Sequence, residues 1–155
     1  VPRMVGVQPE GCAPFVKAIQ EDLTPDYLFQ HPWKNINTIS TALADDIPLD
    51  CHTGIPAVKI SGGAAISVSD EETLEASKQL STLEGIFAEP SSCTTVAAIE
   101  KLKSEGLIQE DENTCCLITG SGFKDLPVIK DILPPIQVVE NNFDWKTTLR
   151  EILSN

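Results

Sequence analysis

Short continuous apolar runs alternate along this chain with longer stretches in which apolar residues recur at helical spacing. The runs are typical of buried strands, and we predict strands at residues 3–8 (RMVGVQ), 64–69 (AAISVS), 114–118 (TCCLI) and 137–139. Helical segments separate the runs, and this alternation favours an α/β fold with a mostly parallel sheet.

The helical stretches carry recognisable start and stop signals. Ser69 followed by Glu72 is a capping box, and Gly85 is a typical C-terminal cap for the helix between them. Residues 22–37 contain Pro25, Pro32 and scattered aromatic residues, and we expect a loop there. The remaining helices are predicted at residues 14–19, 53–60, 92–103 and 144–153, with a short helix in TISTALADDIP (38–48).

Length and charge narrow the class of protein. A chain of 155 residues suits a single α/β domain, and we expect a core at residues 1–134 and a tail with the last helix at residues 135–155. The net charge of −12, without a basic stripe, disfavours binding to nucleic acid or anionic lipid. We find no apolar run of membrane-spanning length and no signal peptide, so we expect a cytoplasmic protein.

The five cysteines do not form a metal-binding pattern. They are Cys12, Cys51, Cys93, Cys115 and Cys116. None has the C-x-x-C spacing of a zinc site, and the two histidines do not complete one. We therefore expect no metal site, and we interpret the cysteines as small buried apolar residues of a reducing compartment.

Ligands in open α/β sheets collect beyond the carboxyl ends of strands, and three segments in such places could carry chemistry. The first, Gln8–Cys12, is better explained as a helix start. TGSG (119–122) offers close backbone approach and two hydroxyl groups, but it matches no phosphate-loop motif, so it is either a plain turn or a ligand site. A hydroxyl at Thr119 could hydrogen-bond a neutral aromatic nitrogen.

The segment AEPSS (88–92) is the remaining candidate. Pro90 suits the first position of a helix, and small side chains follow it, which leaves the first-turn N–H groups accessible. Glu89 would lie at the helix N-terminus, where the helix dipole favours a negative charge. This segment is either a helix start packed on a neighbour or the wall of a site.

Five stretches together resemble a known family. They are PRMVGVQPEGCAP, TISTALADDIP, SGGAAISVSDEETLEA, LEGIFAEPSSCTTVAAIEKL and LITGSGFKDL. Their order and spacing resemble the C-terminal part of the threonine synthases, within the tryptophan-synthase-like (fold type II) pyridoxal-phosphate enzymes. The resemblance covers roughly residues 2–130. It implies the C-terminal part of that family's large domain, a three-layer structure with helices on both faces of the sheet.

The resemblance also implies a reaction and a set of cofactor-binding residues. The reaction converts O-phosphohomoserine and water to threonine and phosphate, with pyridoxal 5'-phosphate as electron sink. Thr119 would face the pyridine nitrogen, Gly120 would allow close backbone approach, Glu89 would lie near the ring, and Thr38 would contact the cofactor's edge. The full-length enzyme would be a homodimer.

The family's catalytic lysine and its phosphate-binding loop have no counterpart in these residues. The Schiff-base lysine and the Gly/Asn-rich loop lie upstream of the matching region, so this chain would contain no catalytic residue. Lys124 occurs in GFKD, the place of the family's second G-x-K-D motif, and is not assigned as the nucleophile. We therefore expect an inactive fragment. A cysteate synthase, a threonine/serine ammonia-lyase or a non-catalytic binding or regulatory domain are the alternatives.

Overall fold

A two-stranded parallel sheet forms the centre of the computed structural model, which describes residues 2–130 and 144–153. Strand β1 (Val5–Pro9) pairs with β2 (Ala64–Val68) in an unbroken register from Val5–Ala64 to Pro9–Val68. Both strands were predicted from their apolar runs. The backbone of Glu10 extends the ladder by one further hydrogen bond, from its N–H to the Val68 carbonyl at 2.8 Å.

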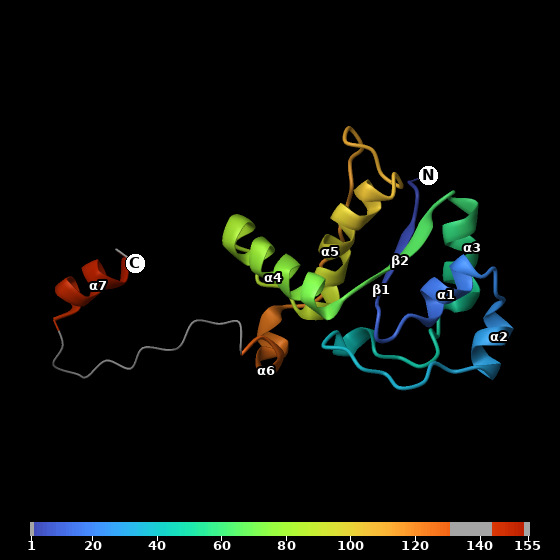
Figure 1. Ribbon diagram of the computed structural model, residues 1–155, viewed down its shortest axis with the longest axis horizontal. Coiled ribbons are helices and arrows are strands. Elements are labelled where there is room, and N and C mark those ends of the chain that lie inside the picture. The colour runs from blue at the N-terminus through green and yellow to red at the C-terminus, as the bar shows by residue number, and fades with distance from the viewer. Residues whose placement is uncertain (1, 131–143, 154–155) are drawn as a thin grey trace.

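Helices cover both faces of this sheet, which gives three layers (Figure 1). Helices α1 (Pro14–Gln20) and α3 (Cys51–Ile60) lie on one side, and α5 (Pro90–Ser104) lies on the other with α4 (Asp70–Glu84) packed against it. The α/β class and the flanked parallel sheet are confirmed. On the α5 side the core consists of Ile66, Val68, Ala98 and Leu102.

The capping signals in the sequence are present in the structure. The Ser69 hydroxyl accepts a hydrogen bond from the Glu72 N–H at 3.1 Å, and the Glu72 carboxylate accepts one from the Ser69 N–H at 2.6 Å. Gly85 ends α4 with φ of 67°, a left-handed conformation that glycine adopts without a steric penalty. Pro90 occupies the first position of α5, as predicted.

Two predictions in the connection between α1 and α3 are wrong. The expected loop at 22–37 contains helix α2 (Pro25–Gln30), because the Thr24 hydroxyl caps it by accepting from the Tyr27 N–H at 3.3 Å. The expected helix at 38–48 is reduced to one 3₁₀ turn, η1 (Thr41–Leu43), because a long-range hydrogen bond to Asp70 holds Thr38 outside any helix.

The predicted buried strand at residues 114–118 is also wrong. The segment is extended, but its backbone has no ladder with any part of the chain that the structure describes. Leu117 is 65% exposed, and Ile118 is exposed as well. The apolar run is typical of a strand, but a strand also needs a partner for its backbone groups, and none lies beside this one in the described ranges.

The rest of the chain forms short elements. These are η2 (Gly122–Lys124), α6 (Leu126–Ile129) and α7 (Trp145–Leu153), the last as predicted to within one residue. The strand predicted at 137–139 and the core–tail boundary at 134 lie outside the described residues. Three cysteines are buried as expected, but Cys115 is exposed and Cys116 only half-buried, because both belong to the unpaired segment.

Candidate functional site

The carboxyl ends of β1 and β2 are joined by the loop that precedes η1. The Asn37 N–H donates to the Gly11 carbonyl at 3.3 Å, just beyond β1. The Thr38 hydroxyl donates to Asp70 Oδ1 at 2.7 Å, just beyond β2, and the Ile39 N–H donates to the other oxygen of that carboxylate at 3.1 Å. Thr38 is therefore fixed at this edge of the sheet by the first residue of α4.

Residues 119–122 run antiparallel to the residues just before α5. The Glu89 N–H donates to the Gly120 carbonyl, and the Gly122 N–H donates to the Phe87 carbonyl, both at 3.0 Å. A Cβ on Gly120 would lie 2.0 Å from Glu89 Cδ, so no larger residue fits without displacing that carboxyl group. Gly120 was predicted to permit close backbone approach to a ligand, and the group that lies against it here is the Glu89 carboxyl group.

Ser92, in the first turn of α5, fixes the position of Thr119. Its hydroxyl oxygen accepts from the N–H of Thr119 at 3.1 Å and from the N–H of Gly120 at 3.0 Å, and it lies 3.2 Å from Thr119 Oγ1. Two accepted bonds use both lone pairs, so the Ser92 proton is donated to Thr119 Oγ1. The Thr119 proton has no acceptor among the described residues, and Thr119 is exposed. Its hydroxyl is thus oriented as an available donor.

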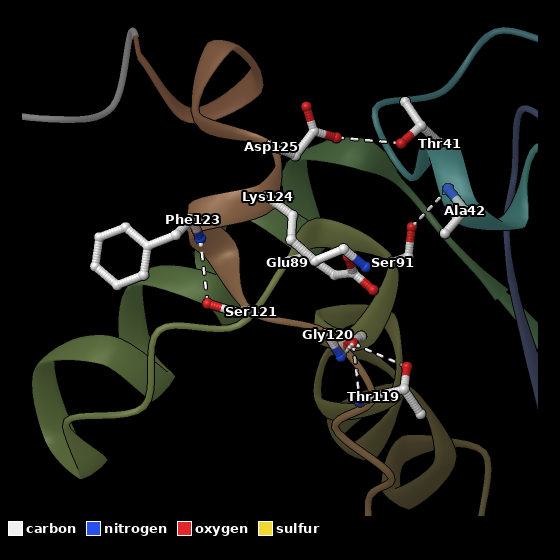
Figure 2. A network of polar contacts seen from close by, with 11 residues as sticks. Thr41, Ala42, Glu89, Ser91, Thr119, Gly120, Ser121, Phe123, Lys124 and Asp125 are labelled. Atoms are coloured by element: carbon white, nitrogen blue, oxygen red, sulfur yellow. Dashed lines mark hydrogen bonds and ion pairs between the residues drawn. The ribbon is translucent and has the colours of Figure 1, made fainter.

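Glu89 is a buried carboxylate with one cationic partner in the described part of the chain. Its side chain is 10% exposed at the N-cap of α5 and makes no hydrogen bond to the first-turn N–H groups. Lys124 Nζ lies 3.2 Å from Glu89 Oε2, and the lysine side chain itself is largely exposed (Figure 2). Glu89 and Lys124 thus form an ion pair beside the N-terminus of α5.

The η1 turn is hydrogen-bonded both to the first turn of α5 and to the end of η2, as Figure 2 shows. The Ala42 N–H donates to the Ser91 hydroxyl at 3.1 Å, and the Thr41 hydroxyl donates to Asp125 Oδ2 at 3.1 Å. The neighbouring Ser40 hydroxyl is fully buried and has no partner within residues 2–130 and 144–153. The loop carrying Thr38 and the segment carrying Thr119 are therefore both anchored near the N-terminus of α5.

The structure brings three of the four predicted cofactor-binding residues into direct contact. Glu89, Thr119 and Gly120 form one cluster, whereas Thr38 reaches it only through η1 and its hydroxyl already donates to Asp70. Sequence reasoning missed Ser92 and Lys124 as partners of this cluster. The small residues after Pro90 indicated an accessible helix start, but the hydrogen bonds of Ser92 span 27 and 28 positions and leave no local pattern.

The parallel sheet with helices on both faces defines an α/β protein, and the cluster of Glu89, Thr119 and Gly120 is its candidate ligand site. Residues 1–120 match the family of pyridoxal-phosphate dependent enzymes, and the chain belongs to this family. Enzymes of this family use pyridoxal phosphate as cofactor. No helix in the described ranges is long and apolar enough to cross a bilayer.

The most informative relatives are named threonine synthase. That of Methanosarcina acetivorans is 39% identical over 147 residues, which cover 93% of this chain and 35% of the relative. That of Methanocaldococcus jannaschii is 41% identical over 125 residues, covering 81% of this chain and 30% of the relative. The chain thus spans about a third of the length of these relatives.

Solved structures support the fold. The threonine deaminase of T.th. superposes with a TM-score of 0.54 at 20% identity, covering 68% of this chain and 35% of that chain. Serine racemase from Dictyostelium discoideum superposes with a TM-score of 0.50 at 21% identity, covering 71% of this chain and 35% of that one. Both neighbours are fold type II pyridoxal-phosphate enzymes.

The residues of the cluster suit one side of this cofactor. A pyridine nitrogen is a hydrogen-bond acceptor, and Thr119 presents a hydroxyl whose proton is available because Ser92 supplies its other contact. Gly120, which follows Thr119, has no side chain that would cover the neighbouring backbone. The fit is confined to the ring nitrogen: Thr38, predicted at the cofactor's edge, has its hydroxyl proton committed to Asp70.

Proposed function

We propose that this chain forms the ring-nitrogen side of the active site of a threonine synthase, which converts O-phosphohomoserine and water to threonine and phosphate. The bound cofactor would supply an electron sink for this reaction. The observation that carries the proposal is the Ser92–Thr119 arrangement, in a chain up to 41% identical to proteins of that name.

Thr119 would donate its hydroxyl proton to the ring nitrogen. A neutral hydroxyl stabilises the unprotonated nitrogen, whereas a carboxylate at this position would favour the protonated form. Ser92 would fix the Thr119 rotamer, because its proton goes to Thr119 Oγ1 and leaves the Thr119 proton directed away. Gly120 would let the ring lie against backbone.

Glu89 would border the ring and the reacting substrate. Its carboxylate is buried and held by Lys124 at 3.2 Å, so it presents a fixed negative charge at the start of α5. Neither residue is proposed as the group that attaches the cofactor. By the family resemblance that lysine belongs to the part of the relatives that these residues do not span, and we propose that the isolated 155 residues are inactive.

The test uses a chimera in which this chain replaces the matched portion of the Methanosarcina acetivorans protein. We expect release of phosphate and threonine from O-phosphohomoserine. Thr119→Val, which keeps the shape but removes the donor, should lower kcat at least tenfold and change the absorbance of the bound cofactor, while Thr119→Ser should restore both. Release of ammonia from threonine or serine, without turnover of O-phosphohomoserine, would assign the ammonia-lyase reaction instead.

The isolated chain provides a second test of the same proposal. Incubation with pyridoxal phosphate followed by borohydride reduction should give no stoichiometric lysine adduct by mass spectrometry. A stoichiometric adduct on Lys124 would overturn the assignment of Lys124 as the partner of Glu89 rather than the attachment site.

A further inference from the structure

Helix α7 carries an apolar stripe that is exposed in the described part of the chain. Trp145 and Leu149 lie four positions apart on one face of the helix and are 57% and 45% exposed. The sequence continues this spacing with an isoleucine at position 152. Figure 1 shows α7 apart from the sheet and the helices that cover it. Helices shorter than about 12 residues are marginal in water on their own, so a helix of 9 residues with this pattern is expected to pack against another surface.

A basic edge runs beside the apolar stripe of α7. Lys146 and Arg150 are also four positions apart, each directly after an apolar residue of the stripe, and both are exposed. The Lys146 ammonium group lies 5.6 Å from the centre of the Trp145 ring, so the basic edge adjoins the apolar stripe. A surface that binds α7 should therefore offer an apolar floor with acidic residues beside it.

Helices α4 and α5 form a groove with both of these properties. This α4–α5 groove has a volume of about 670 Å³, and its apolar lining consists of Ala76, Val96 and Ala97. Two of these three side chains are alanine, and small side chains at a helix contact let another helix approach closely. Acidic residues of both helices also line the groove, among them Glu71, Glu75 and Glu100.

The acidic residues of the groove lack a cationic partner in the described ranges. Glu71, Glu75 and Glu100 take part in none of the ion pairs formed there. Lys101 also lines the groove, but its ammonium group donates to the Ser67 carbonyl of β2 at 2.8 Å. The basic edge of α7 would therefore supply the positive charge that this side of the groove lacks.

The connection that leads to α7 is long enough to reach the groove. It begins at the end of α6 (Ile129) and leads to Trp145, so fully extended it would span up to about 50 Å. Helices α4 and α5 have 15 residues each, a length of about 22 Å. The Gly122 N–H, four residues before α6, donates to the Phe87 carbonyl between α4 and α5. The chain therefore enters α6 beside this pair of helices, within reach of the whole groove.

We propose that α7 docks in the α4–α5 groove of its own chain. The apolar stripe of α7 lies on the alanine and valine floor, and its basic edge faces the glutamates. This is the helix-in-groove mode of recognition, here within one chain. The inference goes beyond the proposed function and does not rest on it, because docking of α7 needs neither cofactor nor substrate.

NMR spectroscopy of the full 155-residue chain tests the docking directly. At low ionic strength the ring protons of Trp145 should give nuclear Overhauser cross-peaks to the methyl groups of Val96 and Ala97. Trp145→Ala removes the ring current and should shift those methyl resonances. The methyl resonances of Ile55 and Val58, which belong to α3 on the other face of the sheet, should not move.

Charge reversal along the groove provides matched variants. Glu75→Lys combined with Glu100→Lys should abolish the cross-peaks, whereas Glu84→Lys, an exposed position of α4 outside the groove, should preserve them. Adding Lys146→Glu and Arg150→Glu to the first pair should restore the cross-peaks. Should the reversed variants fold poorly by circular dichroism, salt gives the same test on the unaltered chain. Raising the ionic strength to about 1 M shortens the Debye length to about 3 Å and should weaken the cross-peaks.

Four results would overturn the proposal. A folded chain without cross-peaks from Trp145 to the groove would show that α7 does not dock there. Cross-peaks from Trp145 to Leu83, Ile86 or Leu126 would place the helix on a different exposed apolar surface. Cross-peaks found only between differently labelled copies would identify the α7 of a second chain as the occupant. Loss of the contacts in a folded chimera with the Methanosarcina acetivorans protein would show that the groove receives another part of that polypeptide.

Discussion

Residues 64–68 (AAISV) and 114–118 (TCCLI) have similar apolar sequences and opposite environments. The first is β2, with Ile66 and Val68 buried against α5 and its backbone paired to β1. The second is extended but unpaired among the described residues, and both Leu117 and Ile118 are exposed. Apolar, strand-forming residues therefore specify a strand only where a neighbour satisfies the backbone and covers the side chains.

The candidate site joins these two unlike regions. Glu89 and Ser92 belong to α5 and its N-cap, packed on the sheet and on α4, whereas Thr119 and Gly120 directly follow the unpaired segment. Three contacts to the Ser92 hydroxyl and one backbone bond from Glu89 hold the second pair against the first. The position of Thr119 thus depends on a few polar contacts rather than on burial of its own segment.

The largest contrast is expected from one substitution made in both regions. Leu102→Ala should lower the free energy of unfolding by about 3 kcal/mol, because Leu102 is 3% exposed in the α5-side core and truncation leaves a cavity. Leu117→Ala should change it by less than about 0.5 kcal/mol, because that side chain is already 65% exposed. Urea denaturation followed by circular dichroism measures both.

Equal losses for the two variants would contradict the contrast. A large loss at Leu117 would mean that the segment is covered in solution, and a small loss at Leu102 would mean that α5 does not form part of the cooperative core. Leu80→Ala, at a partly buried position between α4 and α5, should fall between the two and calibrates the series.

A smaller contrast is expected between two buried serines near the site. Ser92→Ala removes the acceptor for the Thr119 and Gly120 amides, and we expect their local opening to become easier by about 1–2 kcal/mol, a rise in exchange rate of roughly five- to thirtyfold. Ser40→Ala removes a buried hydroxyl without a partner among the described residues, so stability should be unchanged or slightly higher. Amide hydrogen exchange measured by NMR distinguishes the two.

Unchanged exchange at Thr119 and Gly120 in Ser92→Ala would show that the antiparallel contact with residues 87–89 holds the segment without Ser92. Ser92→Thr, which keeps the hydroxyl, is the matched control and should preserve protection. A marked loss of stability in Ser40→Ala would indicate that this hydroxyl has an acceptor after all.

Local signals in the sequence predicted the paired sheet and the helices packed on it well, and the candidate site only in part. The capping box at Ser69, the stop at Gly85 and the start at Pro90 are short-range features, and all three are confirmed. Helix α2 was missed because two prolines and aromatic residues obscured a cap formed by Thr24. The strand predicted at 114–118 was wrong because no described part of the chain supplies a strand to pair with it.

The candidate site residues also divide into those that local signals predicted and those that depend on contacts far apart in the sequence. The positions of Glu89 and Gly120 followed from a helix start and a glycine turn, and the structure places them in contact. The availability of the Thr119 proton could not be predicted, because it depends on the lone pairs of Ser92, which is 27 residues away. Thr38 was expected at the cofactor's edge, but the role of Asp70 as its partner was hidden by the position of Asp70 in the first turn of α4.

The smallest contrast is expected from helix caps in the two regions. Ser69→Ala removes a complete capping box from α4, a helix of 15 residues packed on α5, and should lower the free energy of unfolding by about 1 kcal/mol. Ser121→Ala removes a cap from η2, a single 3₁₀ turn whose bond to the Phe123 N–H is 3.4 Å long, and should cost a few tenths of a kcal/mol at most. Ser69→Asp, which keeps a capping acceptor, should retain most of the stability in urea denaturation. If Ser121→Ala cost as much as Ser69→Ala, η2 would belong to the cooperative core, and residues 114–124 would be stable without a strand beside them.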